Sequence, residues 1–144
     1  MALKQILEKI LFVNKYENIC SEYNDFDNSL RGNNKKLYID IIERLGYETE
    51  YISNGSFFRI KQNDVLLHLV LKDGLVEPLL YVMKNGDAVY PRGRFDAIAE
   101  EIRNGFRDKY TIPFYTSESD LEGILKEVFS IYEDVKREVE NELS

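Results

Sequence analysis

Two-residue turn signals divide the middle of this chain into short β-prone runs. The dipeptides are Asn54-Gly55, Asp73-Gly74 and Asn85-Gly86. Asn and Gly tolerate the positive φ angles of a type I′ turn, so Asn54-Gly55 predicts a tight β-hairpin. Together the three signals predict an antiparallel meander of four or five strands.

Two of the runs carry further information about their place in the sheet. The run VLLHLVL, residues 65–71, is almost continuously apolar, which is typical of a strand buried on both faces. The next run contains Pro78. Because proline has no backbone N–H to donate to a ladder, we expect this strand to lie at a sheet edge or to contain a bulge.

Helical periodicity flanks the meander on both sides. Apolar residues at intervals of three and four predict helices over 2–16, 37–45, 95–106 and 119–143, with a further short helix between 17 and 30. Gly46 is expected to end the 37–45 helix in the left-handed region, and Gly105 to stop the next one. Residues 110–115 predict a short extended run, and Ser119 with Glu122 forms the expected capping box of the last helix.

This order of elements predicts an α+β fold in one domain, residues 1–144. We expect N-terminal helices, an antiparallel four- to five-stranded meander, and C-terminal helices. The last of these is a long amphipathic helix packed on one sheet face. The single cysteine, Cys20, excludes an internal disulfide and suits a reducing compartment. No apolar run matches a signal peptide or a membrane span, so we expect a soluble cytoplasmic protein with no membrane partner.

The negative charge of the chain is concentrated at one end. The net charge is −7, and residues 116–144 contain nine acidic and three basic side chains. An acidic chain repels nucleic acid phosphates, so we expect no nucleic acid partner. A basic protein partner is the alternative that this charge favours, beside the simpler interpretation that the acids serve solubility.

Most catalytic and metal-binding constellations are excluded by the inventory of side chains. His68 is the only histidine and Cys20 the only cysteine, so no zinc site can be built from soft ligands, and their spacing does not support a catalytic dyad. The run from Asn24 resembles a calcium loop in its alternating oxygen ligands, but Leu30 and Lys36 stand where that loop needs glycine and glutamate. We therefore expect no enzymatic activity, no metal and no cofactor.

Arg92 and Arg94 flank Gly93 at the expected entrance to the 95–106 helix. With the free amides of the helix they could bind an anion such as a phosphate or a carboxylate. The alternative, which we favour, is structural. Asp96 would offset the arginine charge, and the guanidinium groups would pair with nearby acids such as Glu100 or those of the last helix.

The segment that follows residue 16 is all negative up to residue 30. It contains Glu17, Glu22, Asp25 and Asp27, with Tyr23 among them. Tyrosine is enriched in protein interfaces because it offers contact area at low entropic cost. We therefore predict that Glu22, Tyr23, Asp25 and Asp27 bind a basic protein partner, together with acids of the last helix that point outward.

In size, acidity and lack of catalytic groups, the chain resembles bacterial immunity proteins for secreted nuclease toxins. This resemblance implies an inhibitor that neutralises a basic toxin domain. The chain is also similar to secretion-type chaperones, which are small, acidic α+β proteins that usually dimerise, although it has more helical segments before its first strand. A homodimer, or an uncharacterised domain that binds a small anion through Arg92 and Arg94, remains an alternative.

Overall fold

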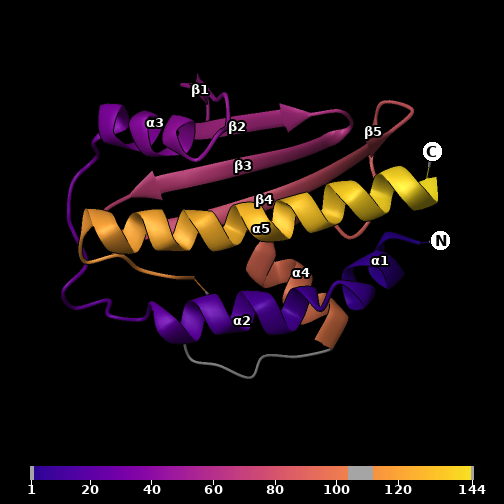
Figure 1. Ribbon diagram of the computed structural model, residues 1–144, viewed down its shortest axis with the longest axis horizontal. Helices are drawn as coiled ribbons and strands as arrows, with labels where there is room; N and C mark the ends of the chain where they lie inside the picture. Colours follow the sequence, from indigo (N-terminus) through magenta and orange to yellow (C-terminus); the bar gives the residue numbers. More distant parts are fainter. Residues whose placement is uncertain (1, 104–111, 144) are drawn as a thin grey trace.

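The computed structural model describes residues 2–103 and 112–143 and confirms the α+β fold (Figure 1). An antiparallel sheet is ordered β1-β2-β3-β4-β5, and a further short strand, β6, pairs with β4. The strands are β1 (Glu50–Ile52), β2 (Phe57–Gln62), β3 (Val65–Lys72), β4 (Leu75–Lys84), β5 (Asp87–Ala88) and β6 (Gly93–Arg94). The helices are α1 (Leu3–Lys9), α2 (Phe12–Glu22), α3 (Lys35–Arg44), α4 (Phe95–Arg103) and α5 (Glu118–Leu143).

The glycine-containing turns connect the strands largely as expected. Asp73-Gly74 and Asn85-Gly86 form two-residue loops in which both residues have positive φ angles. The type I′ prediction for Asn54-Gly55 is wrong, because β1 and β2 are joined by four residues, 53–56, with positive φ at Gly55 and Ser56. The β2–β3 turn lacks glycine and uses Asn63, at φ 57°, which the sequence analysis did not single out.

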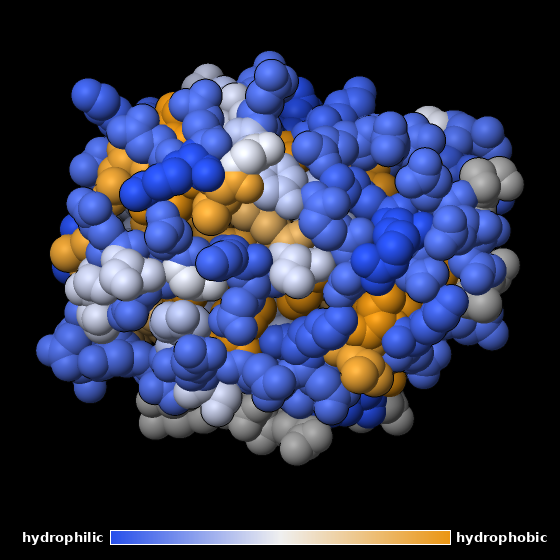
Figure 2. Space-filling view, viewed as in Figure 1, coloured by the Kyte–Doolittle hydropathy of each residue, from blue (hydrophilic) through white to orange (hydrophobic). Residues whose placement is uncertain are grey.

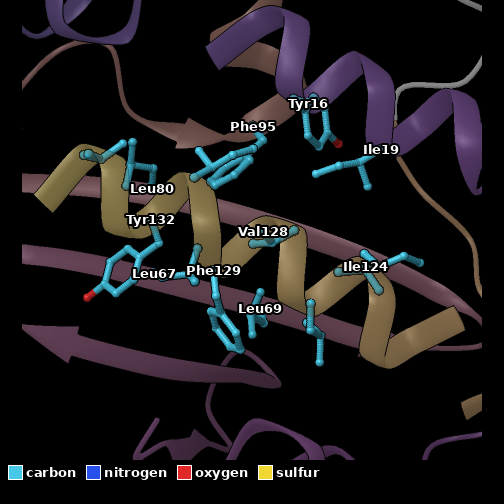
Figure 3. Close-up of a cluster of buried hydrophobic side chains, with 14 of the residues drawn as sticks. Tyr16, Ile19, Leu67, Leu69, Leu80, Phe95, Ile124, Val128, Phe129 and Tyr132 are labelled. Atoms are coloured by element: carbon cyan, nitrogen blue, oxygen red, sulfur yellow. The ribbon is translucent and has the colours of Figure 1, made fainter. Parts of the chain in front are cut away.

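The helices that the structure describes pack against one face of the sheet. Along β3 the buried residues alternate with half-buried ones, so the prediction that this strand is covered on both faces is wrong. In Figure 3, side chains of α5 point toward Leu67 and Leu69 of β3 and Leu80 of β4. The Tyr38 ring of α3 meets the inward-facing Phe58 ring at 5.9 Å between centroids. The helices therefore gather on the face that β3 presents through its odd-numbered residues.

β4 is not the edge strand that Pro78 predicted, because β5 and β6 pair with it on the side away from β3, but Pro78 itself lies outside these pairings. The backbone N–H of Val76 points away from β3 and donates to the carbonyl of Pro113. Two residues later, the nitrogen of Pro78 faces the same side, between this contact and the short pairing of β4 with β6. Its missing N–H therefore costs the β3–β4 ladder no hydrogen bond.

The N-terminal helices differ from the predicted ones. The expected 2–16 helix is broken after Ile10, because Leu11 adopts the left-handed conformation with φ 61° and leaves its side chain 57% exposed. Helix α2 then continues to Glu22, and the short helix expected between 17 and 30 is not formed. From residue 23 the backbone bonds to other segments instead, beginning with the Tyr23 carbonyl, which accepts from Phe114 N–H at 2.9 Å.

The later helices follow the prediction more closely. Helix α3 ends before Gly46, whose φ of 97° confirms the expected left-handed residue. The N-cap of α5 is Ser117 rather than Ser119, since its hydroxyl accepts from Asp120 N–H at 3.1 Å. The Asp120 carboxylate binds Thr116 through N–H and hydroxyl donors, which fixes this earlier start. The expected stop at Gly105 and the first residues of the 110–115 run lie outside the described residues.

Candidate partner-binding loop

The four residues predicted to bind a partner lie on one continuous segment between α2 and α3. Glu22 is the last residue of α2, and Tyr23, Asp25 and Asp27 follow it. We call residues 22–34 the acidic loop. The three carboxylate side chains are exposed, whereas the Tyr23 side chain is half-buried. The structure thus places the predicted carboxylates at the surface of one loop and partly buries the tyrosine that lies among them in the sequence.

Hydrogen bonds fix the acidic loop to the β3–β4 turn and to the segment before α5. Gly32 N–H donates to the Asp73 carboxylate at 3.1 Å, and Asp73 N–H donates back to the Gly32 carbonyl at 2.9 Å. Leu30 N–H donates to the Tyr115 carbonyl at 2.9 Å. A side chain at Gly74 would come within 2.4 Å of Ser29 Cβ, so the turn needs glycine for this approach as well as for its φ. These contacts anchor residues 29–32 of the loop to the sheet and to the segment before α5.

Tyr23 attaches the start of the acidic loop to α5. Its hydroxyl lies 2.4 Å from the position that a Cβ on Gly123 would occupy. Glycine in a helix interior costs about 1 kcal/mol relative to alanine. The Tyr23–Gly123 contact supplies the physical reason for a glycine at this position, because any larger residue would push the ring away.

Two large apolar side chains of the acidic loop are exposed. Phe26 is 47% and Leu30 41% exposed, although both residues belonged to the apolar stripe of the short helix predicted there. The Phe26 ring meets Phe114 edge-on at 5.1 Å between centroids, and the Arg31 guanidinium lies 5.7 Å from its centre. These residues were missed as binding candidates because helical spacing predicts burial rather than exposure.

The carboxylates of the acidic loop form no ion pair with the part of the chain that the structure describes. Among the ion pairs of the described residues, none includes Glu22, Asp25 or Asp27. Asp25 accepts hydrogen bonds from the backbone and side-chain amides of Asn28. Burial raises the pKa of Glu127 on α5, and the nearby Glu22 raises it further. The acidic side chains at the start of the loop and on α5 therefore act on one another, and Arg31 is the one cation within the loop.

The acids of the last helix are in a different situation. Five of the nine acidic residues in 116–143 pair with the chain's own cations: Glu122, Glu133, Asp134, Glu138 and Glu142. The shortest of these contacts between elements joins Lys15 of α2 to Asp134 at 2.6 Å. Much of the excess charge that the sequence concentrates in α5 thus connects α5 to α1, α2 and α3. Its ion-paired carboxylates are less available to a partner than those of the acidic loop.

The arginine junction before α4 is occupied in part by an internal carboxylate. The Nε and Nη2 atoms of Arg94 donate to the two oxygens of Asp96, whose side chain is only 4% exposed. The carboxylate raises the pKa of Arg94 above its already high value. The partner of Arg94 is therefore Asp96, rather than Glu100 or an acid of the last helix. Arg92 is exposed beside it.

The histidine and the cysteine lie in different layers. Cys20 is buried on α2, in the helical layer. His68 lies on the opposite face of the sheet, with its ring stacked 4.3 Å from Phe57 and 4.9 Å from Tyr81. Burial lowers the pKa of His68 to about 4, and Arg59 contributes to the shift. Among residues 2–103 and 112–143, no group of three or more histidine, cysteine or acidic side chains is arranged to hold a metal ion.

Figure 2 shows the helical side of the molecule as mostly hydrophilic, with apolar side chains gathered in small patches. Within the described residues, no helix combines the length and apolar composition needed to cross a bilayer. Comparison with protein-family models, with curated protein sequences and with solved structures finds no match to this chain.

Proposed function

We propose that this protein binds a basic protein partner through the acidic loop and neutralises it, in the manner of an immunity protein that inhibits a toxin domain. One observation carries the proposal. Three exposed carboxylates, without ion-pair partners among the described residues, share a loop anchored by backbone hydrogen bonds with two exposed apolar side chains, Phe26 and Leu30.

Each part of this surface has a physical role in binding. The carboxylates would steer a cationic partner and raise the association rate, since complementary charge acts before contact. Phe26 and Leu30 would supply the apolar contacts that slow dissociation. The anchoring of residues 29–32 means that less entropy is lost when the loop is bound.

The arrangement supports this function over anion binding at Arg92 and Arg94. Two donors of Arg94 are already used by Asp96, and the pair is needed to compensate a buried carboxylate. A free anion would have to compete with that internal partner. Within residues 2–103 and 112–143, no cation pairs with the carboxylates at the start of the acidic loop.

The experiment compares two triple variants with the same change in charge. The test variant is Glu22→Gln/Asp25→Asn/Asp27→Asn, and the control is Glu8→Gln/Asp64→Asn/Asp87→Asn, at exposed positions on other elements. The partner recovered with the tagged wild-type chain from its native cells is purified, and its association rate is measured at low and high salt.

We expect the test variant to lower the association rate at low salt about tenfold or more, with a smaller effect at high salt. The control should lose much less. Phe26→Ser should mainly raise the dissociation rate. Equal losses in the two triple variants, or no loss in either, would contradict binding through the acidic loop.

A further inference from the structure

The outward face of the sheet is apolar in its centre, although none of the described helices covers it. We call this surface the open face. Its central residues alternate with the buried ones along the strands and are all half-buried: Ile52, Phe57, Leu66, His68, Val70, Leu75, Leu79, Tyr81 and Met83. An antiparallel sheet with one solvated face normally carries polar residues there. The composition of β3 is typical of a strand covered on both faces, but the described residues cover only one of its faces.

The charges of the open face leave two lysines uncompensated. Arg59 pairs with Glu50 on the neighbouring strand at 2.7 Å, and Glu77 lies close enough to Arg94 to raise its pKa. Lys61 and Lys72 are exposed, and neither has an ion-pair partner among the described residues. Although the net charge of the chain is −7, the open face thus presents two exposed lysines that pair with none of the described acids.

The two lysines lie at opposite ends of the apolar centre. Lys61 is the cross-strand neighbour of Leu66, near the start of β3, and Lys72 is the last residue of that strand. Six residues of extended chain separate Leu66 from Lys72, or roughly 20 Å at about 3.3 Å per residue. An α-helix covers roughly 20 Å with about 13 residues.

From this geometry we infer that the open face binds an amphipathic helix of a partner protein, with an apolar stripe on one side and acidic residues about 13 positions apart. A helix is the cover that the sheet already uses on its other face, where α5 lies across β3 and β4 (Figure 1). The apolar stripe would bury Leu66, Val70 and their neighbours. The acidic residues would meet Lys61 and Lys72. Lys72 adjoins the β3–β4 turn that holds the acidic loop. The open face nevertheless offers lysines and apolar side chains where the loop offers carboxylates, so it takes a different partner.

The test uses defined probes and the full chain. Three labelled 20-residue helical peptides share one scaffold: a leucine stripe flanked by glutamate, the same stripe flanked by lysine, and a serine stripe flanked by glutamate. A 12-nucleotide oligouridine is the fourth probe, because a basic sheet face with aromatic rings also suits single-stranded RNA. Binding is followed by fluorescence polarisation, with the chain's mass in solution measured in parallel.

We expect the leucine–glutamate peptide to bind at least tenfold more tightly than the other three probes. The net charge of −7 alone would favour the lysine peptide, so this preference would have to come from the open face. Lys61→Glu/Lys72→Glu should weaken this binding at least tenfold and improve binding of the leucine–lysine peptide. Both substitutions are at exposed side chains, so the fold should persist. Lys4→Glu/Lys36→Glu, with the same charge change on α1 and α3, should change the affinity less than twofold.

Three results would overturn the inference: no preference for the leucine–glutamate peptide, tighter binding of oligouridine, or a wild-type homodimer that Lys61→Glu/Lys72→Glu dissociates. The acidic-loop variant Glu22→Gln/Asp25→Asn/Asp27→Asn should bind the leucine–glutamate peptide as the wild type does. That arm separates failure of this inference from failure of the function proposed for the loop.

Discussion

Arg94 is half-exposed, yet its guanidinium group stabilises a buried carboxylate, that of Asp96. Asp96 lies in the first turn of α4, where a negative charge is favoured by the helix dipole, but its burial removes it from water. The two hydrogen bonds from Arg94 replace that lost solvation. The arginine stands at a helix entrance, where a cation alone is unfavourable, because the carboxylate beside it needs a fixed donor pair.

Arg94→Met should lower the free energy of unfolding by roughly 1–3 kcal/mol, because it leaves the Asp96 carboxylate buried without its donors. This expected loss of unfolding free energy is smaller than the loss for a fully buried ion pair, because the Arg94 guanidinium is half-exposed. Arg94→Met/Asp96→Asn should lose less than the sum of the two single variants in urea unfolding. Strict additivity would contradict a direct coupling between the two side chains.

At the scale of elements, the acidic loop packs against α5 where Tyr23 meets Gly123, a residue without a side chain. The contact between Tyr23 and Gly123 joins residues 100 positions apart, so no local pattern in the sequence indicates it. The loop's carboxylates could be predicted, since a run of acids near a tyrosine is visible in the sequence. The exposure of Phe26 and Leu30 could not, because it depends on backbone bonds from residues 73 and 115.

Gly123→Ala should lower the free energy of unfolding by about 1 kcal/mol, although the same change in an unobstructed helix raises it by a similar amount. The reason is the overlap of the new methyl group with the Tyr23 hydroxyl. Ser130→Ala, at an exposed position of α5, is the matched control and should be neutral or slightly stabilising. Adding Tyr23→Phe to Gly123→Ala should recover part of the loss; a double variant no more stable than Gly123→Ala alone would argue against this contact.

The elements that could be predicted are those set by local chemistry. Asp73-Gly74 and Asn85-Gly86 mark their turns because both residues accept positive φ angles. The break at Leu11 carries no such signal, since leucine rarely adopts that conformation. Ser117 and Ser119 both suit the N-cap of α5, and the Thr116–Asp120 bonds decide between them. Which faces of the sheet are covered depends on how all the elements pack together. The apolar run of β3 therefore predicted a strand covered on both faces, whereas the described helices lie on one.

At the scale of the whole molecule, His68 makes stability depend on pH. Its pKa is about 4 in the folded protein and near 6.5 in an unfolded chain, so the unfolded state binds the proton more readily between those values. The contribution of the neutral ring is present above pH 6.5 and is lost as the pH falls toward 4. After allowance for the ring's partial exposure, we expect a loss of about 1–2 kcal/mol.

The measurement is urea unfolding of the wild type and His68→Phe at pH 7.5, 5.5 and 4.5. Phenylalanine keeps a ring between Phe57 and Tyr81 but does not titrate. The difference in unfolding free energy between the two proteins should shift in favour of the variant as the pH falls. A difference that is constant with pH would show that this histidine titrates alike in the folded and unfolded states.

At the end of β3, the two proposed binding surfaces meet. Asp73, which follows Lys72 of the open face, exchanges hydrogen bonds with Gly32 of the acidic loop. Exposed charges act on a charged body from within roughly a Debye length, about 8 Å at physiological salt. Under both proposals, a cationic partner on the loop and an acidic helix on the sheet would therefore be bound near each other.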